Sequence, residues 1–222
     1  MKVVIAVGLV KAVVQSTACA FVGSIPYWRI VSLSVMVKGS EVQDTSRVGG
    51  MRMSVLTRDE LFRAIGDGRI QIEPFSEDMI GPGSVDLSLS NQFRVFKKLR
   101  RGVAVDDTMD LEKITKLIYR NHSFTLLPGE TILGITQEKI RLSPSLCGWI
   151  QGRSRFARIG LLVHMTASFI QPGIDNRQVL EISNMAPFPL ILKPNTRICQ
   201  VIFQTTIGEA VYEGKHMAQD TL

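Results

Sequence analysis

The sequence predicts a mainly β protein, with a barrel or jelly-roll-like sheet and short helices. Two observations favour this class. From Ser123 onward, short strand-like runs follow one another and are separated by turn residues, many of them Gly or Pro. Upstream of Ser123, only two short segments show the spacing of an amphipathic helix. Many short strands with such punctuation are typical of β-barrels and sandwiches.

The composition is that of a globular protein. The chain has 222 residues, of which 45% are apolar and 21% charged, and these values exclude a disordered or collagen-like chain. Residues 1–52 carry six Lys/Arg against two Asp/Glu, whereas residues 53–222 carry twenty against eighteen. The basic character therefore comes largely from the first quarter. Because the body of the chain is nearly neutral, we do not expect nucleic-acid binding.

Residues 1–52 are expected to be an N-terminal extension, and residues 53–222 a single domain. Met51 and Met53 are internal starts just before the first helix signal, so we interpret the extension as a start codon assigned too far upstream, or as disordered chain. A signal peptide or anchor and a genuine extra element are the alternatives. The uncharged run Ala12–Trp28 contains Gly and Pro and is short for a membrane span, so no membrane partner is expected.

The cysteines and histidines argue against a disulfide or metal scaffold. Cys19, Cys147 and Cys199 are far apart and form no CxxC, which fits a reducing cytoplasm. The three histidines have neither HxxxH nor HExxH spacing, so we expect no metal held by protein side chains alone. The predicted location is the cytoplasm.

The first helix is predicted to begin after Thr57. Thr57 and Glu60 have the spacing of a capping box, and Gly66 or Gly68 can end the helix. The apolar residues in between have helical spacing: Leu61, Phe62 and Ile65.

The next predicted elements are a strand and a second short helix, recognised by the strand period of two and by helical spacing. Val85–Leu89 alternates apolar and polar residues and predicts a strand, with a phase shift that indicates a bulge near Asn91. A second short helix is predicted over Asp110–Tyr119, and Pro128-Gly129 predicts a turn. The remaining strands are predicted at residues 123–127, 131–136, 146–150, 160–167, 178–184, 190–192 and 197–205.

The segment Gly152–Glu181 contains the main candidates for ligand binding and acid/base catalysis. Arg153, Arg155 and Arg158 fall within six residues at a predicted strand-to-turn junction. Arginine offers a planar fork of donors that suits phosphate oxygens, so this cluster is either a polyphosphate site or a solvated basic turn.

Glu181 is the candidate acid/base group. In the predicted strand, Leu180 and Ile182 share one face and Glu181 lies on the other, so Glu181 is either an outward glutamate or a group beside a ligand. His164 stands in a Val/Leu-rich run, and we interpret it as a satisfied structural histidine.

Taken together, these segments resemble the dCTP deaminases of the dUTPase-like superfamily. The resemblance runs from Leu56 to the end of the chain. The segments that carry it are PGSVDLSLSNQFRVF (82–96), LLPGETILG (126–134), GRSRFARIGLLVHMTA (152–167), QPG (171–173), VLEISN (179–184) and the tail YEGKHMAQDTL (212–222).

The resemblance implies a dUTPase-like distorted jelly-roll (β-clip) homotrimer with active sites between subunits. The implied substrate is dCTP with Mg²⁺ on its phosphates, and the implied reaction is hydrolytic deamination at C4 to dUTP and ammonia. It also implies dTTP as a candidate feedback ligand. Zinc-dependent deaminases use an HxE…PCxxC constellation. That constellation is absent here, which agrees with a family that uses no zinc.

The resemblance also implies roles for particular residues. Glu181 matches the general base, Ser154 the serine that holds the water and the leaving amine, and Arg158 an arginine that stabilises the site electrostatically. Ala167 matches the small residue that leaves room at the base. The residues implied to bind substrate are Arg153, Ser154, Arg155, Phe156, Ala157, Arg158, Gln171, Val179, Leu180, Tyr212, Lys215 and Gln219.

The sequence departs from the family's pattern at three places, and three alternative functions remain. Gln171 replaces an Asp of many members, Arg155 replaces a Ser, and Ile174, Asp175 and Asn176 stand where many members have an aromatic residue and then Gly. A combined enzyme that converts dCTP to dUMP is the first alternative. A plain dUTPase is disfavoured because residues 164–173 contain no Asp. A non-catalytic nucleotide-sensing module on the same fold is the third.

Overall fold

A computed structural model describes residues 3–7, 10–14, 54–214 and 217–222. The chain divides into two compact units, Met1–Val48 and Gly49–Leu222. In the first unit, strands β1 (Val3–Val7) and β2 (Val10–Val14) pair antiparallel, with Val3 opposite Val14. The interpretation of residues 1–52 as an upstream start or disordered chain stays a prediction, since most of them lie outside the described residues.

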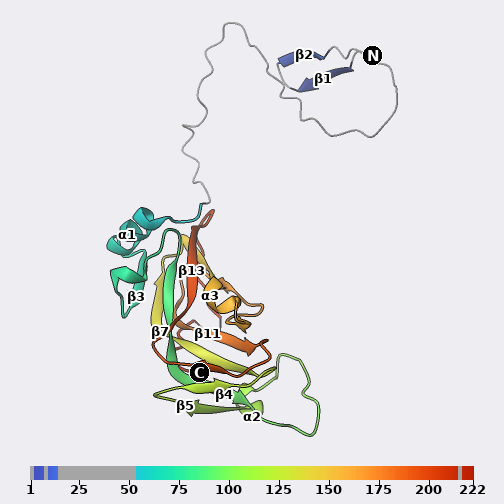
Figure 1. Ribbon diagram of the computed structural model, residues 1–222. Coiled ribbons are helices and arrows are strands. Elements are labelled where there is room, and N and C mark those ends of the chain that lie inside the picture. Colours follow the sequence, from blue (N-terminus) through green and yellow to red (C-terminus); the bar gives the residue numbers. More distant parts are fainter. Residues whose placement is uncertain (1–2, 8–9, 15–53, 215–216) are drawn as a thin grey trace, which may run out of the picture. The chain divides into compact units, whose positions relative to one another are not determined.

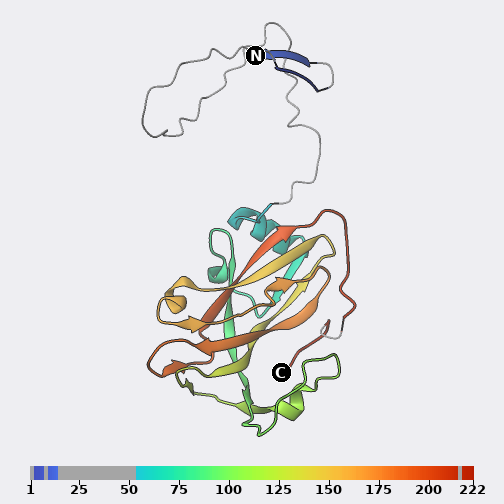
Figure 2. The same ribbon diagram turned by 90° about the vertical axis from the view of Figure 1, so that its right-hand side faces the viewer.

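The second unit is built on one curled antiparallel sheet, shown in Figures 1 and 2. The strand order is β10–β8–β13–β4–β7–β11–β9, with β3 paired to β7 and β5 paired to β4. The strands are β3 (Ile70–Glu73), β4 (Val85–Phe96), β5 (Thr115–Tyr119), β7 (Thr131–Leu142), β8 (Leu146–Gly152), β9 (Leu161–Leu162), β10 (Phe169–Ile170), β11 (Asp175–Asn184) and β13 (Arg197–Thr205). A small second sheet pairs β6 (Phe124–Leu126) with β12 (Leu190–Leu192).

Short helices lie beside the sheet: α1 (Arg58–Gly66), the 3-10 turn η2 (Glu77–Met79), α2 (Leu111–Ile114) and α3 (Ser154–Ala157). The core lies inside the curled sheet, where alternate residues of the long strands are fully buried. Leu87 on β4, Ile135 on β7, Leu180 on β11 and Phe203 on β13 are all 0% exposed. The mainly β class predicted from the sequence is confirmed.

Several predicted elements form with small differences. Helix α1 begins after Thr57 and ends at Gly66, but the Thr57 side chain makes no capping hydrogen bond. The side-chain part of the predicted capping box is therefore wrong, and the Glu60 carboxylate instead accepts a hydrogen bond from Arg63. The predicted bulge in β4 is confirmed by a shift in its pairing with β7 between Leu89 and Phe93.

The helix predicted over Asp110–Tyr119 is wrong in its second half. Only Leu111–Ile114 is helical, and residues 115–119 form β5 along β4. The Thr115 hydroxyl donates to the carbonyl of Leu111, and a β-branched residue there favours a strand. Pairing with the free edge of β4 outweighs the helical spacing.

Two further differences concern the site. The strand predicted over residues 160–167 is reduced to β9 at Leu161–Leu162. The basic junction after Gly152, predicted as a turn, is one helical turn, α3. Strands β3 and β10 were not predicted; they have four and two residues.

Candidate active site

Glu181 lies on the middle of β11 and faces a cavity of about 460 Å³. Its neighbours Leu180 and Ile182 are fully buried on the opposite face, as the predicted alternation requires. On β7, Leu133 pairs directly with Glu181 and lines the same cavity. The predicted site residues that line it are Ala167, Gln171, Val179, Glu181, Tyr212 and Gln219.

The carboxylate of Glu181 has two polar neighbours. His164 places Nδ1 2.8 Å from Oε2 of Glu181, and the main-chain N–H of Met165 donates to the same oxygen at 3.4 Å. Burial by itself raises the pKa of Glu181, but the contact with His164 and the Met165 N–H outweigh it. The pKa of Glu181 therefore lies below its usual value. At neutral pH the carboxylate is ionised and able to accept a proton.

His164 is not the satisfied structural histidine predicted from the sequence. Its side chain is 5% exposed, and its Nε2 has no hydrogen-bond partner in the part of the chain that the structure describes. Its Nδ1 faces a carboxylate in the candidate site. The apolar run around it could not show this contact, because β11 brings Glu181 from 17 positions further along the chain.

The segment 153–158 leaves β8 and forms α3. Ser154, Arg155 and Arg158 are exposed, and Phe156 packs against the core. Arg153 is held within the chain: Nη2 lies 3.0 Å from Oδ2 of Asp86, and Nη1 donates to the carbonyl of Arg197 at 2.9 Å. Burial raises the pKa of Asp86, and Arg153 opposes that rise. Arg153 thus fixes the start of α3 on β4 and β13.

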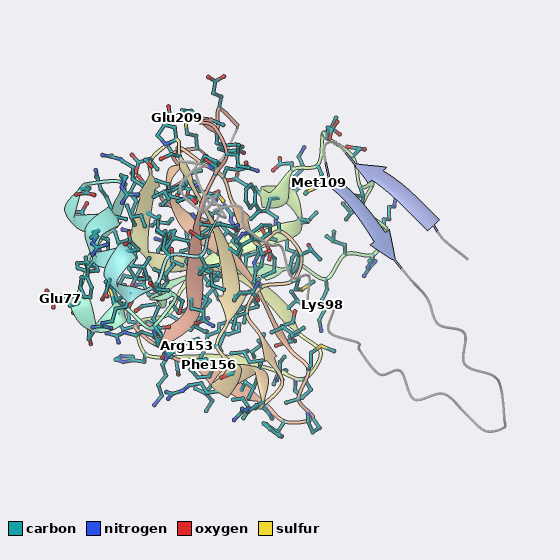
Figure 3. The ribbon with its side chains drawn as sticks, turned by 90° about the horizontal axis from the view of Figure 1, so that it is seen from above. Glu77, Lys98, Met109, Arg153, Phe156 and Glu209 are labelled. Atoms are coloured by element: carbon teal, nitrogen blue, oxygen red, sulfur yellow. The ribbon has the colours of Figure 1, made fainter. Side chains whose placement is uncertain are left out.

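Residues 153–158 do not line the cavity that Glu181 faces. Figure 3 shows Arg153 and Phe156 at one edge of the domain, with Glu209, just before the tail, at the opposite edge. The cavity that Glu181 faces and the exposed basic turn at residues 153–158 are therefore two distinct surfaces of the chain. Leu180 contributes no side chain to either part, because it is 0% exposed in the core.

The tail is docked beside the cavity. The N–H of Tyr212 donates to the carbonyl of Pro172 at 3.0 Å, and the N–H of Arg177 donates to the carbonyl of Gln219 at 2.9 Å. These bonds place Tyr212 and Gln219 in the cavity wall. Lys215, which was also predicted to bind substrate, lies outside the described residues.

Sequence reasoning did not assign eight residues of the cavity wall to the site: Leu111, Leu133, Phe169, Ile170, Ile174, Asn176, Arg177 and Gln178. Phe169 stands between Ala167 and Gln171, and residues at 167, 169 and 171 all line the cavity. The period of two through those positions was a usable signal. Leu111 of α2 also lines the cavity. No local pattern could have predicted it, because it comes from 70 positions upstream of Glu181.

Within the described ranges, no group of three or more His, Cys, Asp or Glu side chains is placed to hold a metal ion. None of the helices described is long and apolar enough to cross a membrane.

A family model described as dCTP deaminase-like matches residues 55–206. The chain is 35% identical over 173 residues to a protein of Methanothermobacter thermautotrophicus named "dCTP deaminase, dUMP-forming", covering 76% of this chain and 88% of that protein. It is 40% identical over 162 residues to a protein of Rhodospirillum rubrum named "dCTP deaminase", covering 69% and 83%.

Among solved structures, a 2'-deoxycytidine 5'-triphosphate deaminase from Agrobacterium tumefaciens is similar in fold, with a TM-score of 0.56 at 18% identity. That match covers 69% of this chain and 49% of that chain, so this chain spans about half the length of that protein. The family match covers the sheet, α3 and the strand that carries Glu181. The chain belongs to the dCTP deaminase-like family.

Proposed function

We propose that this protein is a dCTP deaminase, in which Glu181 is the general base. The observation that carries the proposal is the Glu181 carboxylate facing a cavity of about 460 Å³, with Nδ1 of His164 2.8 Å from its Oε2 and the Met165 N–H donating to the same oxygen. Both named relatives described above are dCTP deaminases.

In the proposed reaction, Glu181 takes a proton from a water molecule as the water oxygen bonds to C4 of cytosine. Glu181 passes this proton to N3 of the cytosine ring, and a tetrahedral carbon that carries both the hydroxyl and the amino group forms at C4. The hydroxyl proton is then transferred to the amino group, the bond between C4 and the exocyclic nitrogen breaks, ammonia leaves, and a C4 carbonyl remains. A strand-held carboxylate suits this role, because its position is fixed before the substrate arrives.

We assign the exposed turn of α3 to the phosphates and to the leaving amine. Ser154, Arg155 and Arg158 are exposed and free to meet a ligand, whereas Arg153 is committed to Asp86 and holds the turn in place. Because this turn does not border the cavity of its own chain, a second copy supplies it. The proposed homotrimer places Ser154 and Arg158 of one subunit beside Glu181 of another.

Mg²⁺ enters the proposed site on the nucleotide. The described residues offer no cluster of carboxylates for the ion, whereas a triphosphate offers several hard oxygen ligands. The arginines of α3 complement the remaining phosphate charge. The proposed feedback ligand dTTP and the cytoplasmic location stay predictions.

The product is the second question. The relative from Methanothermobacter is named as dUMP-forming, and this favours a combined enzyme that also releases pyrophosphate. The relative from Rhodospirillum is named without that activity. Formation of dUMP is therefore our second candidate. Its support is the name of this relative, and no residue of the cavity favours it.

The test uses the full chain with dCTP and excess Mg²⁺. Nucleotides are separated by ion exchange, and ammonia and pyrophosphate are measured in parallel. Ammonia with dUTP supports a simple deaminase, and ammonia with dUMP and pyrophosphate supports the combined enzyme. Binding of dCTP with no ammonia would overturn the proposal and favour a nucleotide-sensing module.

A further inference from the structure

Arg94 is a buried cation in the described part of the chain that the proposed reaction does not use. It lies on β4, its side chain is 9% exposed, and its Nε has no hydrogen-bond partner among the described residues. Burying a guanidinium costs free energy of folding unless its N–H donors are hydrogen-bonded. The acceptors around Arg94 therefore indicate which segments it stabilises.

Strand pairing places Arg94 on the cavity side of the sheet. Arg94 of β4 pairs with Leu133 of β7, and Leu133 pairs with Glu181 of β11. Directly paired residues of antiparallel strands point to the same face. Arg94 therefore shares a face with the candidate base, two strands away, and Leu133 between them lines the cavity.

Three groups surround the guanidinium. Nη1 donates to the Thr115 hydroxyl at 3.3 Å, and Nη2 lies 3.5 Å from the Glu112 carboxylate. Nη2 also donates to the main-chain oxygen of Leu222 at 3.0 Å, which is the shortest of the three contacts. Thr115 and Glu112 orient the Arg94 guanidinium so that its Nη2 donates to the last residue of the tail.

The tail has further contacts around this one. The Leu222 N–H donates to the side-chain oxygen of Gln92 at 3.4 Å, also on β4, and Lys139 lies 3.3 Å from Asp220. Lys139 is exposed enough for its ion pair to be screened, whereas the Arg94 contact is sheltered. The bonds to Arg94 and Gln92 are therefore the better sheltered contacts of Leu222, and the bond to Arg94 is the shorter of the two.

We propose that Arg94 is a positioning residue that fastens the tail, and with it Gln219, against the nucleotide cavity. This inference rests on the proposed function for its kinetic effect, but not for the contact itself. Arg94 touches no substrate and acts through its bond to Leu222.

The kinetic test compares Arg94→Met in the full chain and in a chain truncated after Gly208. In the full chain we expect kcat/KM for dCTP to fall about tenfold, which corresponds to about 1.4 kcal/mol. In the truncated chain the same substitution should change kcat/KM by less than about twofold, because there is no tail left to fasten. Arg120→Met, which removes an exposed arginine on the chain just after β5, is the control for charge and should change neither chain.

A second measurement is made without nucleotide. Amide hydrogen exchange of residues 217–222, and of the Asp175 and Arg177 amides that bond to the tail, should be faster in Arg94→Met and in the gentler Arg94→Lys than in the unmodified chain. Arg94→Lys keeps the buried charge and loses the fork, so it reports on the contact even where Arg94→Met fails to fold.

The outcomes separate the two claims. An equal kinetic penalty in the full and truncated chains, or unchanged exchange in the tail, would overturn the inference and leave Arg94 as a support for α2 or the sheet. If the unmodified chain turns over no dCTP, the proposed function fails, and the exchange measurement still decides whether Arg94 fastens the tail.

Discussion

At the scale of single residues, the chemistry of the site depends on the partners of two side chains. Burial raises the pKa of Glu181, and the contacts with His164 and the Met165 N–H bring it below its usual value. Arg153 forms an ion pair with Asp86 of the same chain. The sequence motif indicated both residues but not their partners, because Asp86 and His164 lie 67 and 17 positions away along the chain.

Replacing His164 by Asn is expected to move the pH dependence of activity. Burial raises the pKa of Glu181 and His164 lowers it, so without His164 the pKa of Glu181 rises. The carboxylate is then protonated at higher pH, and the acid limb of kcat/KM shifts to higher pH.

The measurement is kcat/KM for dCTP between pH 5 and 9. His122→Asn is the matched control, because His122 is exposed and makes none of the described contacts of Glu181. An unchanged acid limb in His164→Asn, with activity retained, would show that His164 does not set the charge of Glu181.

At the scale of elements, the tail and the Pro172-Gly173 turn form one unit. Gly173 has φ +72°, and a Cβ added to it would lie 2.9 Å from the Val211 backbone. Glycine is therefore required at position 173 for two reasons: its φ is positive, and the Val211 backbone leaves no room for a Cβ. The Pro-Gly turn could be predicted from sequence, but its contact with the tail could not, because 38 positions separate Gly173 from Val211.

Gly173→Ala is therefore expected to displace the tail and to raise KM for dCTP about tenfold, since Tyr212 leaves the cavity wall. Gly129→Ala is the matched control. Gly129 has φ +77° with nothing within 4 Å of the added Cβ, so it carries the same backbone strain of about 1–2 kcal/mol without touching the tail.

Kinetics and thermal unfolding of both variants decide between strain and docking. Similar losses of melting temperature with a rise of KM in Gly173→Ala alone support the docking. Equal KM values in the two variants would show that the tail does not depend on this turn.

The elements that sequence reasoning misplaced share one cause. Residues 115–119 had helical spacing but became β5, because the edge of β4 was available to pair with them. The long strands β4, β11 and β13 were predictable because each buries one face against the core along most of its length. Short segments take their conformation from neighbours that are distant in sequence.

At the scale of the whole molecule, the central feature is that one chain separates Glu181 from the α3 turn. The sequence motif joined them into one site, and the fold places them in two parts. The proposal of a homotrimer with shared sites follows from that separation together with the family.

Co-expression of two inactive chains tests the sharing. Glu181→Gln and Ser154→Ala are each expected to be inactive alone. Mixed trimers contain sites in which Glu181 comes from one variant and Ser154 from the other, so about one quarter of the sites are intact if mixing is random. Activity well above that of either variant supports shared sites. No recovery in trimers shown to be mixed would mean that each chain completes its own site.

The most direct test of the central claim is Glu181→Gln in the full chain, measured for both turnover and binding of dCTP. The substitution keeps the shape of the side chain and removes the base, so kcat is expected to fall by about 10³ while calorimetric titration still detects dCTP binding. Glu77→Gln, which changes an exposed carboxylate on η2, should leave both unchanged. Retention of more than about one tenth of kcat in Glu181→Gln would contradict the assignment of Glu181 as the general base.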